Sequence, residues 1–325
     1  MRYALSALAA LTLSLSLIAA LPAQEMADVE IEVIELRESV YMLTGRGGNI
    51  GLVVTDDGAF LIDDQYAPLT DRILAAVSSI TNQPIRFVLN THWHGDHTGG
   101  NENLAERGTV VVAHDNVRQR MSTEQVSEFF GRTTPPAADG ALPVITFNDE
   151  VRFHLGNETV HAFHVPQAHT DGDSIVHLHE ANVIHAGDVI FYGLYPFVDG
   201  ESGGSLPGLI DAVDRIADYV NEETVIIPGH GPLMRERQLG QYRAMLATVH
   251  ARLKSRIDAG EDLDTIQAAN ITEEYDAFWG SGFIPPERWV ELLYTNMTRE
   301  PQHSPDHEHG PESRHDHRSE HEQSN

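Results

Sequence analysis

The sequence predicts a layered α/β fold, and two observations lead to this prediction. Short apolar runs with the alternation of β-strands recur along most of the 325 residues, and longer runs with helical spacing lie between them. No obvious linker interrupts the chain before residue 300. Strands interspersed with helices favour one layered domain over two independent ones.

The first part of the chain is predicted to form strands and one helix. Residues 28–44 alternate as strands do, residues 45–49 form a hairpin-type turn, and strands follow at 50–55 and 59–63. Residues 69–80 have helical spacing. A short apolar strand at 86–90 then leads directly into Thr91 and His92.

The second part is predicted to contain further short strands and three helices. The predicted strands cover 109–113, 144–147, 151–155, 159–165, 174–179, 183–186 and 224–227. The predicted helices cover about 206–220, about 236–259, and 285–297.

The composition excludes several classes of function. There are 21 basic and 49 acidic residues, a formal net charge of -28, which opposes binding to the phosphates of nucleic acids. The chain has no cysteine, so disulfides, thiolate chemistry and cysteine-ligated zinc are excluded. It has 19 histidines, whose placement is the main source of information about function.

The two ends of the chain differ from its middle. Residues 1–23 combine a positive start, an apolar stretch and small residues, as a signal peptide does. The alternative is a membrane anchor, since the apolar run has about the minimum length to span a bilayer. Cleavage after Ala23 would give a periplasmic or secreted protein that has no membrane contact. Residues 301–325 are rich in histidine and acidic residues and lack large apolar side chains, which predicts a disordered tail. The predicted domain is therefore 24–300.

One segment concentrates potential metal ligands. Residues 91–100 read Thr-His-Trp-His-Gly-Asp-His-Thr-Gly-Gly and place His92, His94, Asp96 and His97 in a loop directly after an apolar strand. Loops at the carboxyl ends of strands are where α/β folds usually bind ligands. Imidazole and carboxylate together suit zinc or a similar metal.

This segment resembles the signature of the metallo-β-lactamase superfamily, and the resemblance extends over about residues 30–235. It implies an αββα sandwich of two mixed β-sheets flanked by helices, with two metal ions at one edge. Three downstream segments resemble those that supply the remaining ligands in the family. They contain His169, Asp188 and His230, and each follows an apolar strand.

The resemblance also implies how the ligands are divided. The first metal would take His92, His94 and His169, and the second would take Asp96, His97 and His230. Asp188 and a hydroxide would bridge two zinc ions, with iron or manganese also possible, and the hydroxide would attack a carbonyl carbon. Asp96 would orient the hydroxide or carry a proton. Asp63, at a strand end, is either a hydrogen-bond partner of a ligand histidine or an ordinary carboxylate.

The sequence departs from the zinc β-lactamases of the first subclass. Those enzymes use a cysteine ligand where Asp188 stands, and commonly a lysine three residues later, where this chain has Phe191. An aspartate at this place resembles glyoxalase-type hydrolases and lactonases. Tyr192, Tyr195 and Phe197 are expected either to wall the pocket or to pack in the core. Residues 122–140 are expected to form a lid.

The leading interpretation is a zinc metallo-hydrolase acting on a small molecule, a cyclic amide or ester. A β-lactam is the first candidate substrate, a lactone the second, and a thioester of the glyoxalase II type the third. A mononuclear iron enzyme that oxidises sulfur on the same scaffold is a further alternative. A periplasmic zinc-storage protein is an alternative of another class, suggested by the acidic charge and the histidine-rich tail. The histidines outside the ligand segments are expected to be structural or surface residues.

Overall fold

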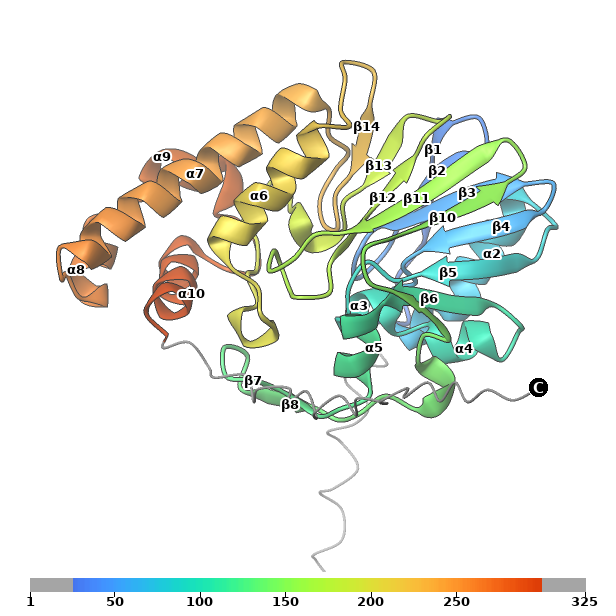
Figure 1. Cartoon of the computed structure of the whole chain (residues 1–325), viewed down its shortest axis with the longest axis horizontal. Helices are drawn as coiled ribbons and strands as arrows, with labels where there is room; N and C mark the ends of the chain where they lie inside the picture. The colour runs from blue at the N-terminus through green and yellow to red at the C-terminus, as the bar shows by residue number, and fades with distance from the viewer. Residues whose placement is uncertain (1–25, 300–325) are drawn as a thin grey trace, which may run out of the picture.

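The computed structural model describes residues 26–299 (Figure 1). The predicted signal peptide and the histidine-rich tail lie outside the described residues, and both remain predictions. Among residues 26–299, no helix combines the length and the apolar character that crossing a bilayer requires.

The larger sheet has seven strands in the order β1-β2-β3-β4-β5-β6-β9. Its antiparallel half consists of β1 (Glu32–Arg37), β2 (Val40–Thr44), β3 (Ile50–Thr55) and β4 (Gly58–Ile62). Its parallel half continues from β4 through β5 (Ile85–Leu89), β6 (Val110–His114) and β9 (Ile145–Phe147). The sheet is therefore mixed.

The smaller sheet has five strands in the order β10-β11-β12-β13-β14. These are β10 (Glu150–Leu155), β11 (Glu158–His164), β12 (Ser174–Leu178), β13 (Val183–His185) and β14 (Val225–Ile227). The pairs are antiparallel except for β13 and β14, which are parallel because α6 (Leu206–Ala217) lies between them in sequence.

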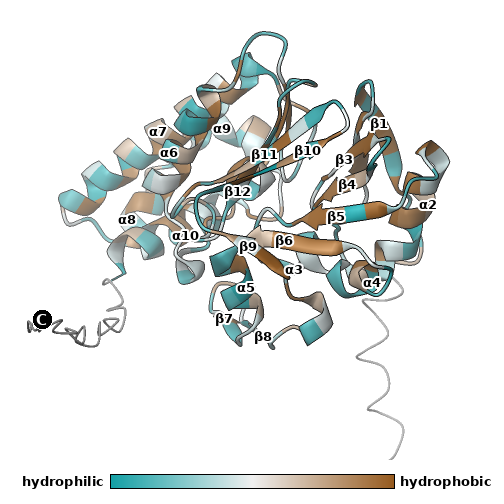
Figure 2. Cartoon of the chain, turned by 45° about the vertical axis from the view of Figure 1, so that its right-hand side comes forward, coloured by the Kyte–Doolittle hydropathy of each residue, from teal (hydrophilic) through white to brown (hydrophobic). Residues whose placement is uncertain are grey.

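The two sheets pack face to face through one apolar cluster. Phe60, Ile62 and Leu89 of the larger sheet share this cluster with Val176 and Val183 of the smaller one. Hydrophobic residues run along the strands of both sheets (Figure 2). Strands β4, β13 and β14 are buried along their whole length, which explains their continuous apolar runs, whereas β10 alternates between exposed and less exposed residues.

Helices cover both outer faces. On the larger sheet, α2 (Thr70–Ile80) and α4 (Asn101–Ala105) contribute to a second apolar cluster. On the smaller sheet, α6, α7 (Glu236–Asp258), α9 (Glu273–Trp279) and α10 (Pro286–Thr298) contribute to the largest cluster, and α8 (Leu263–Ala268) packs beside α10. These four layers confirm the predicted αββα sandwich of two mixed sheets.

Several short elements were not expected from the sequence. Helix α5 (Asp115–Met121) buries only Val117 and Met121, too few apolar positions to give a helical period. Helices α8 and α9 were missed for the same reason, since each has only one buried residue. Strands β7 (Gln125–Ser127) and β8 (Arg132–Thr134) pair as a hairpin in which no strand residue is buried.

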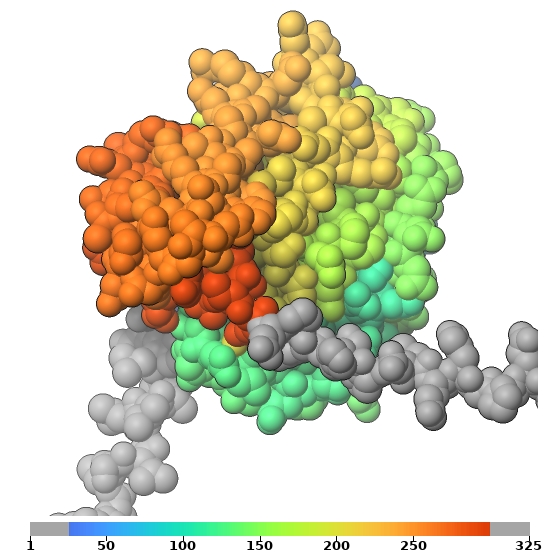
Figure 3. Space-filling view, turned by 60° about the vertical axis from the view of Figure 1, so that its left-hand side comes forward, coloured from blue at the N-terminus to red at the C-terminus, as the bar shows by residue number. Residues whose placement is uncertain are grey.

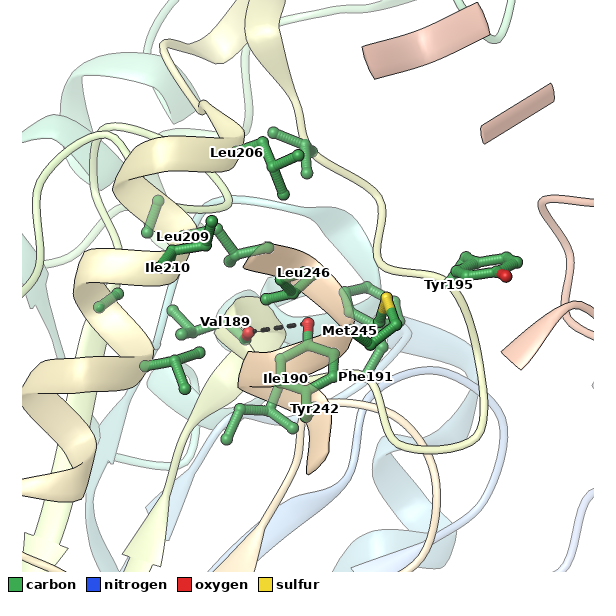
Figure 4. Close-up of a cluster of buried hydrophobic side chains, with 14 of the residues drawn as sticks. Val189, Ile190, Phe191, Tyr195, Leu206, Leu209, Ile210, Tyr242, Met245 and Leu246 are labelled. Carbon is green, nitrogen blue, oxygen red and sulfur yellow. Dashed lines mark hydrogen bonds between the residues drawn. The ribbon is translucent and has the colours of Figure 1, made fainter. Parts of the chain in front are cut away.

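The largest apolar cluster also supports the loop that follows β13. Tyr242 of α7 is fully buried, and its hydroxyl donates a hydrogen bond to the carbonyl oxygen of Val189 at 3.2 Å (Figure 4). Leu209 and Leu246 lie in the same cluster (Figure 4). The helical layer thereby fixes the backbone directly after Asp188.

Candidate metal centre

The seven predicted ligands come from four separated segments and converge at one edge of the sandwich. His92 and His94 lie in the loop after β5, and Asp96 and His97 lie in α3 (Gly95–Thr98). The remaining ligands follow β11, β13 and β14. They are His169, Asp188 and His230.

The side chains form two adjoining groups, with the ligand atoms of each group within 4.8 Å of one another. In the first group, Nδ1 of His94 lies 3.1 Å from Nε2 of His92 and 2.9 Å from Nε2 of His169. Oδ2 of Asp188 lies 3.7 Å and 3.6 Å from the same two Nε2 atoms. Such spacings suit four donors around one ion with metal–ligand bonds of about 2 Å.

The second group consists of Asp96, His97 and His230. Nε2 of His230 lies 3.4 Å from Nε2 of His97 and 3.3 Å from Oδ2 of Asp96. Oδ1 of Asp188 lies 3.1 Å from Nε2 of His97 and 3.4 Å from Nε2 of His230. Asp188 therefore presents one oxygen to each group, which is the geometry of a bridging carboxylate.

Asp63 fixes the orientation of ligands in both groups. Its fully buried carboxylate accepts a hydrogen bond from Nδ1 of His97 at 2.8 Å. It also accepts one from the Thr91 hydroxyl at 2.8 Å, and that hydroxyl lies 3.1 Å from Nδ1 of His92. Both histidines consequently turn Nε2 toward the metal groups. Of the two alternatives for Asp63, the structure places it as the partner of a ligand histidine.

Two further partners of the ligands were not anticipated. Asp199 lies 3.0 Å from Nε2 of His94 through Oδ2, and its other oxygen caps a short helical turn. The carbonyl oxygen of Phe197 accepts from Nδ1 of His169 at 2.6 Å. The only sequence signal for Asp199 is its place before a turn, since it lies 105 residues from the histidine that it contacts.

Two glycines allow the backbone to approach the ligands closely. A Cβ atom at Gly48 would lie 2.1 Å from Cε1 of His97. A Cβ atom at Gly229 would lie 2.0 Å from Oδ1 of Asp188. Between these loops, the side chain of Asn49 donates to the carbonyl oxygens of Pro228 and Gly231, which brackets His230.

The pKa values of the histidines differ between the two groups, because burial dominates in the first group and neighbouring charge in the second. In the first group, burial is the main cause that lowers the pKa of His169 to about 4. In the second group, burial opposes a charge on His230, but Asp188 and Asp96 raise its pKa to about 9. Burial likewise opposes ionisation of Asp188, but His230 and His97 hold its pKa well below the ordinary range. Cation binding to the second group must therefore displace protons.

The donor set fits two metal ions. Oδ1 of Asp188 is buried and lacks a hydrogen-bond partner among the described residues, although it lies close to two imidazoles. An ionised oxygen of this kind would be costly without a cation. Imidazole nitrogens and carboxylate oxygens are ligands that zinc accepts, and manganese and iron accept them also. The two groups are thus consistent with a dinuclear metal site.

A cavity of about 330 Å³ opens above the two groups. His94, Asp96, Asp188 and His230 form part of its floor. Its walls come from the turn at residues 45–49, from the β7–β8 hairpin and from aromatic side chains. The hairpin lies within the segment predicted to be a lid, and its residues do line the cavity.

The three aromatic residues after Asp188 have different positions. Phe197 lines the cavity. Tyr195 is buried in the core, where its ring stacks on Trp289 at a centroid distance of 4.2 Å. Tyr192 packs against Trp279 at 5.7 Å and does not line the cavity. Only one of the three is therefore a wall residue.

The other histidines of the described chain lie outside both metal groups. His185 ends β13 and contacts the carbonyl oxygen of Asn49 at 3.0 Å. His114 and His164 stack on each other at 3.8 Å, and His161 contacts Glu150 at 3.0 Å. These contacts are those of structural residues.

Comparisons with known proteins agree with this geometry. A profile of the metallo-beta-lactamase superfamily matches residues 43–230. The chain is 24% identical over 216 residues to the beta-lactamase-like protein 2 homolog of Caenorhabditis elegans, which covers 66% of this chain and 65% of that protein. It is 22% identical over 210 residues to metallo-beta-lactamase type 2 of Bacillus cereus, covering 62% of this chain and 77% of that enzyme.

A solved structure shows the same architecture. The metallo-beta-lactamase from Pontibacter korlensis matches with a TM-score of 0.55 and 21% identity, covering 67% of this chain and 99% of that one. At this identity the likeness concerns the fold. The matched profile spans more than half of the chain and ends at the last ligand, His230. The chain therefore belongs to the metallo-β-lactamase superfamily, and its candidate metal site is built from histidine and aspartate.

Proposed function

We propose that this protein is a dizinc hydrolase that opens a cyclic amide, with β-lactams as its first substrate class. The observation that carries the proposal is the pair of adjoining ligand groups joined by Asp188 beneath a walled cavity. The cavity volume of about 330 Å³ lies at the lower end of the range for small-molecule sites. Two zinc ions held there would supply Lewis acidity toward a carbonyl oxygen and would lower the pKa of a water molecule.

The chain's own residues would position the reactants. Asp96 has a side chain that is 22% exposed and lines the cavity, so it can meet both solvent and substrate. Burial opposes its ionised form, but His97 and His230 lower its pKa to about 2. As an ionised carboxylate at the floor, it would orient the attacking water or accept its proton. Asp63 and Asp199 would hold the imidazoles of His97 and His94 in their orientations.

A second candidate is hydrolysis of a lactone or a thioester. Two observations support this second candidate. The chain has no cysteine, so aspartate takes the place of the cysteine ligand of the first lactamase subclass. The position three residues after Asp188 holds Phe191, which cannot pair with a substrate carboxylate. Its ring instead stacks on His230 at 4.9 Å.

The alternatives of a mononuclear iron enzyme and of zinc storage make different predictions about metal content. A mononuclear enzyme would leave Asp96, His97 and His230 without a metal, although they form a complete second group. A storage protein would bind many weakly held ions and would show no turnover. Metal analysis that finds two tightly bound ions per chain would favour the dinuclear hydrolase over both.

We also propose that the protein acts outside the cytoplasm after cleavage near Ala23. The apolar N-terminal segment and the absence of cysteine are compatible with that location. N-terminal sequencing of the protein from a cell fraction tests this proposal. A chain that retains residues 1–23 in the membrane fraction would favour the anchor instead.

The function is tested by turnover of a chromogenic cephalosporin with the purified, zinc-loaded protein. Turnover that is lost on chelation and in Asp96→Asn would support β-lactam hydrolysis. If a sample with two bound metals shows no turnover, lactones and thioesters become the leading substrates. The same sample and variant can then be assayed with those compounds.

A further inference from the structure

The cavity mouth contains an arginine that comes from an element far from the ligand segments. Arg132 lies in β8 of the β7–β8 hairpin and lines the cavity. Its guanidinium lies 5.1 Å from the ring centroid of Phe130, in a cation–π contact. Within residues 26–299, no ion pair joins Arg132 to a carboxylate. This is notable in a chain with a formal net charge of -28.

Two aromatic walls lead from the mouth down to the metal groups. On one side, Phe130 lies 4.9 Å from Phe197, whose ring lies 5.9 Å from His94. On the other side, Phe283 lies 6.2 Å from Phe191, which stacks on His230. Each group is therefore flanked by a line of apolar rings.

The outer ends of both walls are open to solvent. Phe130 is 40% exposed, Phe283 is 57% exposed, and Val126 at the hairpin is 59% exposed. All three line the cavity. Exposed apolar side chains grouped at a cavity mouth are typical of a ligand-binding surface.

The hairpin is tied to the body of the protein. The guanidinium of Arg288 in α10 donates to the carbonyl oxygen of Phe129 at 2.9 Å. The backbone N–H of Glu128 donates to the carboxylate of Glu201 at 3.0 Å. Residues of about 120–140 lie directly against α10 in the space-filling view (Figure 3). The hairpin therefore holds Arg132 and Phe130 in place over the cavity.

We propose that Arg132 binds a carboxylate of the substrate while Phe130 and Phe283 contact an adjoining apolar group. The site would then select small apolar carboxylic acids, with the anion held from the hairpin rather than from the loop after Asp188. This inference rests on the proposed function, since it concerns substrates of the same site. Arg132 would then supply the positive charge that Phe191 cannot provide at the position where first-subclass lactamases commonly have a lysine.

The test measures binding, so it does not depend on turnover. The probe is 2-mercapto-3-phenylpropanoate, which has a thiol for zinc, an aromatic ring and a carboxylate, and its methyl ester lacks only the charge. Both are titrated calorimetrically into the full chain with confirmed zinc content. The variants are Arg132→Ala, Arg132→Lys and Phe130→Ala.

The control is Arg215→Ala. Arg215 makes the same kind of contact, with its guanidinium 5.4 Å from the ring centroid of Phe163, but it lies in α6 and does not line the cavity. The control variant removes an arginine of equal charge and similar packing. It should leave the affinities of acid and ester unchanged.

Arg132→Ala should weaken binding of the acid about 5- to 30-fold and change that of the ester less than about twofold. Arg132→Lys should restore part of the difference, because lysine keeps the charge but not the bidentate fork. Phe130→Ala should weaken acid and ester alike. An acid-to-ester ratio that is unchanged in Arg132→Ala would overturn the inference. Failure of cephalosporin turnover would instead overturn the proposed function and leave this ratio measurable.

Discussion

Replacing Asp63 with asparagine should weaken zinc binding at the second group without disturbing the backbone. Asp63 has a φ of 65°, in the left-handed region, which asparagine tolerates better than most residues. The change keeps the size of the side chain and replaces one carboxylate oxygen with an amino group. That group cannot accept the hydrogen bond from Nδ1 of His97.

The magnitude follows from the contacts that are lost. Asp63 accepts from the backbone N–H of Thr91 at 2.7 Å and from two side chains at 2.8 Å each. If the amide oxygen keeps the backbone contact, the amino group faces His97 and favours a proton on Nε2, which is the ligand atom. Loss of one hydrogen bond to a charged group is worth about 1.5–3 kcal/mol. We therefore expect zinc affinity at the second group to fall about 10- to 100-fold.

The assay is competition for zinc against a chromophoric chelator. Asp64→Asn is the matched control, because Asp64 is equally buried, adjacent in sequence, and contacts Gly100 rather than a ligand through its side chain. Thr91→Val tests the connection from Asp63 to the first group, since it removes the hydroxyl between Asp63 and His92. It should weaken only the first zinc ion.

A second zinc ion held by Asp63→Asn as tightly as by the unchanged protein would refute this reasoning. Equal weakening in Asp63→Asn and Asp64→Asn would refute it too, because general loss of a buried carboxylate would then be the cause. Thermal unfolding of the metal-free variants separates loss of ligand orientation from loss of folding.

Three further predictions follow from the same structure. Asp199→Asn should weaken the first zinc ion about 10-fold or more in the same competition assay and spare the second, since its carboxylate contacts only a first-group ligand among the metal residues. Gly229→Ala should abolish stable binding of two metals, because its Cβ would lie 2.0 Å from Oδ1 of Asp188. Gly95→Ala is the control: its Cβ would have no neighbouring atom within 4 Å, so elemental analysis should still find both metals. Burial, and after it Glu180, raises the pKa of Glu158 to about 7. Because the folded state holds this proton more tightly than the unfolded chain, protonated Glu158 stabilises the fold. This stabilisation is complete below about pH 4.5 and is lost as the pH rises through 7. In the unchanged protein, the free energy of unfolding should therefore fall between pH 5 and pH 8. Glu180→Gln should reduce this fall by up to about 1 kcal/mol, after allowance for partial exposure. Urea unfolding that shows the same fall in both proteins would contradict this prediction.

The sequence by itself predicted the candidate ligand set and the long elements. Four candidate ligands fall within six residues, so the loop after β5 and the following helix α3 bring them close together through local structure. The other three each follow an apolar strand, and the ends of strands that share an edge must meet. Strands and helices with several buried positions were predictable because burial on one face imposes a period.

The tertiary structure alone decided which atoms the ligands present and what surrounds them. Asp63 lies 34 residues from His97 in sequence, and Asp199 lies 105 residues from His94. No local pattern encodes such contacts, because they depend on how the two sheets and their loops pack. The β7–β8 hairpin could not be predicted for a different reason: none of its strand residues is buried, so burial imposes no period on them. Its place over the cavity, and with it the position of Arg132, is set by contacts to α10 and to Glu201 that form only in the folded chain.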